Sequence, residues 1–245
     1  MLEALQKIWG WLPALLESTA ITLELTAASV TTAIFLGVFL ALGKLSKKRV
    51  IRSLSSAYVF FFRGTPLLLQ LFFIYYTVQK MLQGVAVSIT DNPGLQGWFW
   101  DGFANALNNS PLNNRFFAAY FAFSLNIAAY LAEIIRAAIQ SIPKGQMEAA
   151  RSLGLTYGQG MRLIVIPQAY RRMVPPVCNE FVMVLKDTSL VSIISLMDLT
   201  YQTRQISTLR ESQLVYIPAM LIYLVLSAFF TIIFNKIEKK LAEHE

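Results

Sequence analysis

Long runs of hydrophobic residues dominate the pattern of this chain. Five such runs alternate with polar connections, at about 21–42, 57–82, 116–135, 177–199 and 214–234. Each holds roughly 20 residues or more, the length that lets an α-helix cross about 30 Å of hydrocarbon. Side chains are 56% hydrophobic and 14% charged, which is too apolar for an ordinary soluble domain. The pattern predicts an all-α integral membrane protein with five transmembrane helices; long buried helices of a soluble protein are the alternative.

Charged residues are distributed unevenly among the connections. Basic residues collect in two of them, at Lys44, Lys47, Lys48, Arg49 and Arg52 in the first and at Arg136, Lys144, Arg151, Arg162, Arg171 and Arg172 in the third. The second connection carries Asp91 and Asp101 instead. Because basic connections stay in the cytoplasm, this alternation predicts an N-terminus outside and a cytoplasmic C-terminus. Topology thus explains the net charge of +7 without a nucleic-acid partner.

The sequence shows no pattern typical of covalent chemistry. It has no GxxxxGK[ST], GxSxG or HExxH motif, and one cysteine, Cys178, and one histidine, His244, make no metal-binding set. We therefore expect neither an enzyme nor a bound metal or cofactor. No internal repeat is evident, which disfavours a secondary carrier built from paired halves. Five helices make a thin wall around a polar passage, so we expect a dimer.

The chain divides into three parts by this pattern. The start, MLEALQKIWGWLPALLES, lacks the basic segment and the cleavage site of a removed signal peptide. We expect 1–17 to be an extracytoplasmic segment, 18–236 the transmembrane domain and 237–245 a cytoplasmic tail.

The third connection contains a short charged segment, EAARSLGLTYGQGMRLIVIP at 148–167. Pro143 suits the start of a helix, helix-forming residues follow as far as Leu153, and Gly154 suits a left-handed stop. The T-x-x-Q spacing that comes next is typical of a capping box.

The capping box starts a second helix, which we expect to run from Thr156 and Gln159 to Pro167. The pattern of loop 143–167 therefore predicts two short helices, joined by a sharp elbow on the cytoplasmic side. The elbow lies either on lipid headgroups or in a cleft of a soluble partner. A DNA-binding helix-turn-helix is disfavoured, because membrane segments leave no room for a third helix.

The residues of this segment resemble a known motif. The segment is similar to the EAA loop of ABC importer permeases. It has EAA, then Gly after three residues, then IVIP after nine more, with Ile166 at the usual leucine. RGTPLLLQLFFIYY (63–76), the stretch from 129 to 155 and LKDTSLVSII (185–194) further resemble the polar amino-acid branch of these permeases, which serves histidine, glutamine, arginine and cystine. The resemblance covers about 18–236, and the long 80–115 connection departs from it.

The resemblance implies a function for the elbow. In that family the loop is a coupling helix that docks into a groove of a cytoplasmic ATPase subunit. It implies that Glu148, Ala149, Ala150, Arg151 and Gly154 contact or position this partner. It also implies two ATPase subunits that bind the ATP, a second permease copy or a related permease, an extracytoplasmic solute-binding protein, and a place in the cell membrane of a prokaryote.

Two acidic residues in the fourth run are candidates for the solute path. Glu180 and Asp187 are seven residues apart, so both carboxylates lie on one helix face, with Asp187 roughly 10 Å deeper in the membrane. Thr188 and Ser189 add hydroxyl groups next to Asp187. These acids either receive a positively charged group of the solute or neutralise basic groups on neighbouring helices. Lys186 lies on another side of the helix.

Three further residues are candidates for gating or structural roles. Arg63 lies one or two turns inside the second run, where its side chain either snorkels to the surface or faces the path. Pro66 is expected to kink that helix. Glu133 is expected to form an ordinary ion pair near the inner end of the third run, with Arg136 as its neighbour.

The sequence therefore predicts the membrane-spanning subunit of an ATP-driven importer for a polar amino acid. Permeases for another small polar solute, such as an opine or an organic ion, are the alternative within the class. Outside it, an ion-coupled carrier that uses Asp187 as a proton site and a membrane-embedded enzyme are weaker alternatives.

Overall fold

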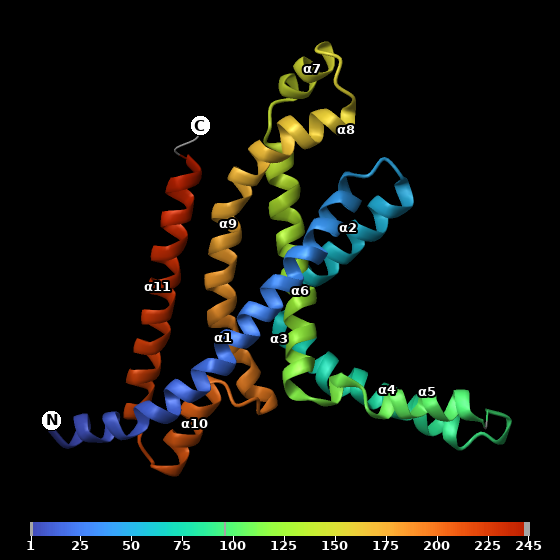
Figure 1. Cartoon of the computed structure of the whole chain (residues 1–245). Helices are drawn as coiled ribbons and strands as arrows, with labels where there is room; N and C mark the ends of the chain where they lie inside the picture. The colour runs from blue at the N-terminus through green and yellow to red at the C-terminus, as the bar shows by residue number, and fades with distance from the viewer. Residues whose placement is uncertain (1, 96, 243–245) are drawn as a thin grey trace.

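The computed structural model describes residues 2–95 and 97–242, and within these ranges the chain forms helices and turns but no strand (Figure 1). Three stretches in these ranges are long and apolar enough to cross a membrane: Ile8–Leu45, Arg115–Gln140 and Gln213–Leu241. They belong to α1 (Leu2–Leu45), α6 (Arg115–Gln140) and α11 (Tyr216–Ala242), the last preceded by a 3-10 turn, Gln213–Val215. The first, third and fifth predicted runs lie in these helices.

The second predicted run is not one kinked helix. Helix α2 (Arg49–Gly64) ends before Pro66, and α3 (Leu67–Phe72) starts after it at an angle of 104°. Thr65 and Pro66 are extended, because proline lacks the N–H that a continuous helix needs and disfavours helical geometry in the residue before it. The helix then continues through a π-helical stretch, Phe73–Val78, into α4 (Gln79–Thr90). The predicted position of the disruption is confirmed, but the disruption is a break.

The helix that contains the first part of the fourth predicted run, 177–199, has other bounds than that run. Helix α9 (Ile166–Asp187) starts 11 residues earlier and gives way to a 3-10 stretch, Thr188–Ile194. Ser195 then turns into the left-handed region, and the Asp198 carboxylate caps α10 (Leu199–Leu209) by accepting from backbone N–H groups. The prediction missed the change because the segment stays apolar through this break. The bent pair of α2 with the helix Leu67–Thr90 counts as a fourth candidate span, beside the three long helices. A fifth span is not among these candidates, so five spans remain a prediction.

The segment between α6 and α9 forms α7 (Lys144–Ser152) and α8 (Tyr157–Gly160). The second helix was expected to end at Pro167, but it continues past this residue. A π-helical stretch, Met161–Val165, leads from α8 directly into α9, and such a stretch changes the hydrogen-bond register just before the proline.

Helix α6 forms the centre of the bundle. Its Phe123, Ile127 and Leu131 are buried among residues of α1, α9 and the α3 region, and small alanines such as Ala118 and Ala122 let the helices approach closely.

The two ends of the bundle carry different elements (Figure 1). The C-terminal end of α11, α7, α8 and the α1–α2 turn lie at one end. The start of α1, α10 and the pair of α4 with α5 (Trp98–Asn108) lie at the other. Short 3-10 turns, Pro93–Leu95 and Pro111–Asn113, flank α5.

Candidate functional site

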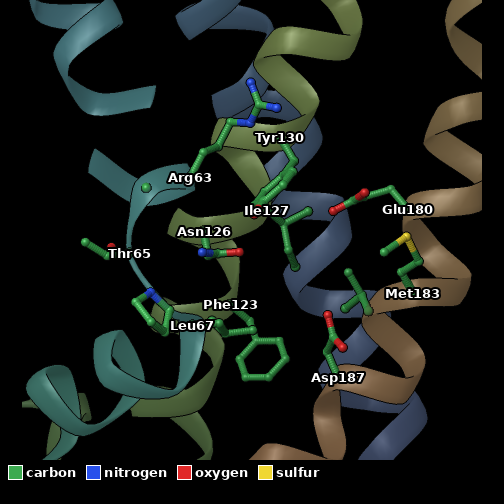
Figure 2. A pocket seen from close by; sticks show the side chains of 13 residues that line it. Arg63, Thr65, Leu67, Phe123, Asn126, Ile127, Tyr130, Glu180, Met183 and Asp187 are labelled. Atoms are coloured by element: carbon green, nitrogen blue, oxygen red, sulfur yellow. The ribbon is translucent and has the colours of Figure 1, made fainter. Parts of the chain in front are cut away.

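A cavity of about 440 Å³ lies between α6, α9 and the break that separates α2 from α3 (Figure 2). Each element brings polar groups to it. Its lining includes Arg63 and Thr65 from the break, Asn126 and Tyr130 from α6, and Glu180, Met183 and Asp187 from α9.

The two acidic residues of α9 both line this cavity. Figure 2 shows the carboxylates of Glu180 and Asp187 on the same side of the helix, directed toward α6, with Met183 between them. Neither carboxylate accepts a hydrogen bond or forms an ion pair with any residue that the structure describes. A carboxylate inside a membrane protein is costly unless a positive partner or water meets it. The cavity thus presents two acids without a basic neighbour in contact.

A buried amide pair fixes the wall opposite these acids. The Asn126 side-chain amide donates to the Gln70 side-chain oxygen at 2.9 Å and to the Phe62 carbonyl at 3.0 Å. The Gln70 amide donates to the same Phe62 carbonyl at 3.0 Å and to the Thr65 hydroxyl and carbonyl at 2.7 and 3.0 Å. Carbonyls that lose their helical partners at the break are satisfied in this way.

Arg63 occupies the end of the cavity nearer to α7 and α8. Its guanidinium lies 5.2 Å from the centre of the Tyr130 ring, within cation–π distance. Arg63 and Tyr130 also line a second cavity of about 550 Å³, together with Lys44 and Glu133. The two side chains therefore lie between two adjacent cavities, and a snorkelling role for the exposed Arg63 stays a prediction beside a role in the path.

Glu133 forms the ion pairs that its position predicts. Its carboxylate accepts from Arg136, at 2.6 and 2.8 Å, and from Lys44 of α1. The partly buried cluster ties α1 to α6.

Thr188 and Ser189 lie beyond the cavity. The Thr188 hydroxyl is buried and donates to the Leu185 carbonyl at 2.7 Å, and the Ser189 carbonyl accepts from Ser192. Their place in the solute path stays a prediction.

The α7–α8 segment presents most of the predicted coupling residues on its surface. Glu148, Ala149 and Arg151 are exposed, whereas Ala150 is buried and positions its neighbours. Gly154 has φ +85°, the left-handed stop that the sequence predicts.

Exposed apolar side chains accompany these residues. Leu153 is 83% exposed and Tyr157 64% exposed on either side of the turn between α7 and α8. The predicted capping box is confirmed: Thr156 and Gln159 bond each other's backbone N–H groups. The segment therefore offers an ordered surface with unpartnered apolar groups.

The sequence matches a known family of membrane proteins. Residues 33–243 match the family described as the binding-protein-dependent transport system inner membrane component. The chain belongs to this family. Its members are components of transport systems and not enzymes, and they are inner-membrane proteins.

Several relatives of this inner membrane component are similar over nearly the whole chain. The L-cystine transport system permease protein TcyB of Bacillus subtilis is 34% identical, over 96% of this chain and 88% of its own. The arginine transport system permease protein ArtQ of the same organism is 35% identical, over 96% and 95%. The nopaline transport system permease protein NocM of Agrobacterium fabrum is 38% identical, over 88% and 82%.

A solved structure supports the fold of the inner membrane component. A crystal structure of an amino acid ABC transporter with histidines contains a chain of 33% identity that superimposes with a TM-score of 0.80, over 96% of this chain and 97% of that chain. An inward-facing MetNI methionine ABC transporter shares the fold, with a TM-score of 0.66 at 16% identity.

Two residues of this inner membrane component were missed by sequence reasoning. Gln70 is a single polar residue in the apolar run LLLQLFF, which is a signal for a buried hydrogen-bond role. A Cβ at Gly160 would lie 2.7 Å from the Met147 sulfur, so this glycine lets α8 approach α7 closely. No sequence signal separates Gly160 from Gly158, which faces open space.

Proposed function

We propose that this chain is the permease subunit of an ATP-driven importer for a polar amino acid, with the cavity between α6 and α9 as part of the solute path. The observation that carries the proposal is the pair of carboxylates, Glu180 and Asp187, that face this cavity without a basic residue in contact. Every amino acid has an α-ammonium group, and a cationic one has a second positive group. Coulombic attraction between these groups and the two carboxylates favours such a solute.

The permease works with several partners in this proposal. Two ATPase subunits bind and hydrolyse the ATP, a second permease completes the wall of the path, and a solute-binding protein delivers the amino acid from outside. Five transmembrane helices, with α9 and the broken α2–α4 helix among them, surround each path. The family and the names of the relatives support this assembly.

The distribution of charge supports one orientation. The α1–α2 turn carries Lys47, Lys48 and Arg49, and it lies at the same end of the bundle as α7 and α8 (Figure 1). By the positive-inside rule this end faces the cytoplasm, so the C-terminus is cytoplasmic and the N-terminus is outside. The ATPase subunits then meet the α7–α8 segment.

Charge-removing variants test the solute path. We expect Asp187→Asn and Glu180→Gln to lower ATP-dependent uptake in vesicles at least tenfold, because each removes an attraction worth more than about 1.4 kcal/mol to the passing solute. Lys186→Gln is the matched control, since this exposed lysine is next to Asp187 but does not line the cavity. Assembly with the partner subunits is measured in parallel. Fully assembled variants that transport at the wild-type rate and with the wild-type selectivity would contradict the proposal.

A second candidate solute is an opine. The nopaline permease is the most identical of the relatives named above, and an opine carries the same ammonium group on a larger frame. Competition of uptake by unlabelled amino acids and opines separates the two.

An ion-coupled carrier would instead lose uptake with an uncoupler and remain active after ATP depletion.

A further inference from the structure

The long connection between α4 and α6 forms a helical hairpin that projects from the bundle. Helices α4 and α5 contact each other along their length and extend crosswise to α6 at the end of the bundle opposite α7 and α8 (Figure 1). Ala86, Ile89 and Ala104 are buried between them, with Leu95 and Leu107 packed alongside. The hairpin has its own small core, so its outer faces are free to contact something else.

The outer surface of this hairpin has one apolar face and one polar face. Helical spacing places Met81 and Val85 of α4 on one flank of the α4–α5 contact, and Phe99 and Phe103 of α5 on the same flank, because the two helices run in opposite directions. These four side chains are 45% to 60% exposed.

The opposite flank is mostly polar, with Val87 as an exposed apolar residue on it. By the same spacing it carries the exposed side chains of Gln83 and Thr90 from α4 and of Asp101 and Asn105 from α5. A hairpin in bulk water has no reason to separate its residues in this way, whereas one at a boundary between water and an apolar phase does.

The direction of the apolar face follows from the bend between α2 and α3. Val78 lines an apolar recess inside this bend together with Phe61, Leu69 and Phe73. Met81 and Val85 follow Val78 by three and seven residues, so they continue its face along α4. The apolar face of the hairpin therefore looks into the bend, toward α2 and the middle of the bundle. The polar face looks away from it.

We propose that the α4–α5 hairpin lies in the interfacial layer of the bilayer leaflet at this end, with its apolar face on the lipid acyl chains and its polar face in water. The apolar face is continuous with the recess between α2 and α3, whose lining is apolar apart from Thr65 and Gln70. Trp98 and Trp100 at the start of α5 suit the headgroup layer, where amphipathic indole rings collect. The occupant of this face is phospholipid, and the hairpin acts as a lateral anchor for the broken span.

Nitroxide labels on matched cysteine pairs test this placement. The background is the full chain with its buried free cysteine removed by Cys178→Ala, reconstituted in vesicles of phosphatidylethanolamine and phosphatidylglycerol. Val85→Cys and Phe103→Cys place a label on the apolar face, and Gln83→Cys and Asn105→Cys place one on the polar face. Collision rates with oxygen, which concentrates in lipid, and with a water-soluble nickel chelate are measured by electron paramagnetic resonance.

We expect the oxygen-to-nickel collision ratio to be several-fold higher for the apolar-face labels than for the polar-face labels. Equal ratios on both faces would overturn the proposal, because they would place the hairpin in water. Apolar-face labels that are shielded from both reagents would also overturn it, because a second copy of the chain or a binding protein would then cover that face. Neither outcome depends on which solute is transported.

Discussion

Gln70 shows how one side chain holds the candidate site in shape. Gln70 is 6% exposed, and its amide group bridges the α2–α3 break to Asn126 of α6. We predict that Gln70→Leu destabilises the protein by about 1–3 kcal/mol, because the Thr65 carbonyl loses the Gln70 amide as its donor and the buried Asn126 amide loses one of its two acceptors. The measurement is thermal unfolding of the solubilised protein.

The matched control for this variant is Ser88→Ala. It also removes a side-chain hydrogen bond to the backbone, from Ser88 to the Gly84 carbonyl at 2.8 Å, but at an exposed position. Equal shifts in melting temperature for Gln70→Leu and Ser88→Ala would show that the amide bridge does not stabilise the break.

The carboxylate pair could be predicted from residue spacing, whereas the amide bridge could not. Seven residues place Glu180 and Asp187 on one helix face whatever the rest of the fold, and the structure brings both to one cavity. The contact of Gln70 with Asn126 joins residues 56 apart in the sequence, so it depends on packing that no local pattern contains.

At the scale of elements, we propose that the turn between α7 and α8 transmits force from a partner subunit into the bundle. Gly154 has φ +85°, where a side chain with a Cβ is strained by roughly 1–2 kcal/mol. We predict that Gly154→Val distorts this turn and lowers the amount of solute taken up per ATP hydrolysed, while ATP hydrolysis continues. Uptake and hydrolysis are measured together in reconstituted vesicles.

Gly158→Val is the control for the turn. This glycine has open space around it and no positive φ, so a side chain there adds bulk to the same segment without strain. Normal coupling in a fully inserted Gly154→Val protein, or equal loss in both variants, would contradict the role of the turn.

The elements themselves could be predicted where their signals are local. Gly154 and the Thr156–Gln159 capping box are such signals, and both are present in the structure. The start of α9 could not be predicted, because a π-helical stretch carries the helix through Pro167. The angle at Pro66 could not be predicted either, since a proline marks a disruption but tertiary packing decides whether it is a kink or a break.

At the scale of the whole molecule, the two ends of the bundle carry different elements, to which we assign separate tasks. One end carries α7, α8 and the basic α1–α2 turn, and the other carries the α4–α5 hairpin and α10 (Figure 1). The cavity proposed for the solute lies between them, beside the break that separates α2 from α3. A partner that presses on α7 and α8 acts directly on α6 and α9, because the segment is continuous with both helices. These are the helices that line the cavity.

The most direct measurement is photo-crosslinking from this surface in the assembled transporter. A benzophenone amino acid is placed at Ala149, which is exposed on α7, and for comparison at Gln83, which is exposed at the other end of the bundle. The account predicts that the probe at Ala149 captures a nucleotide-hydrolysing subunit and that the probe at Gln83 does not. Crosslinks from Ala149 that reach only lipid would contradict it.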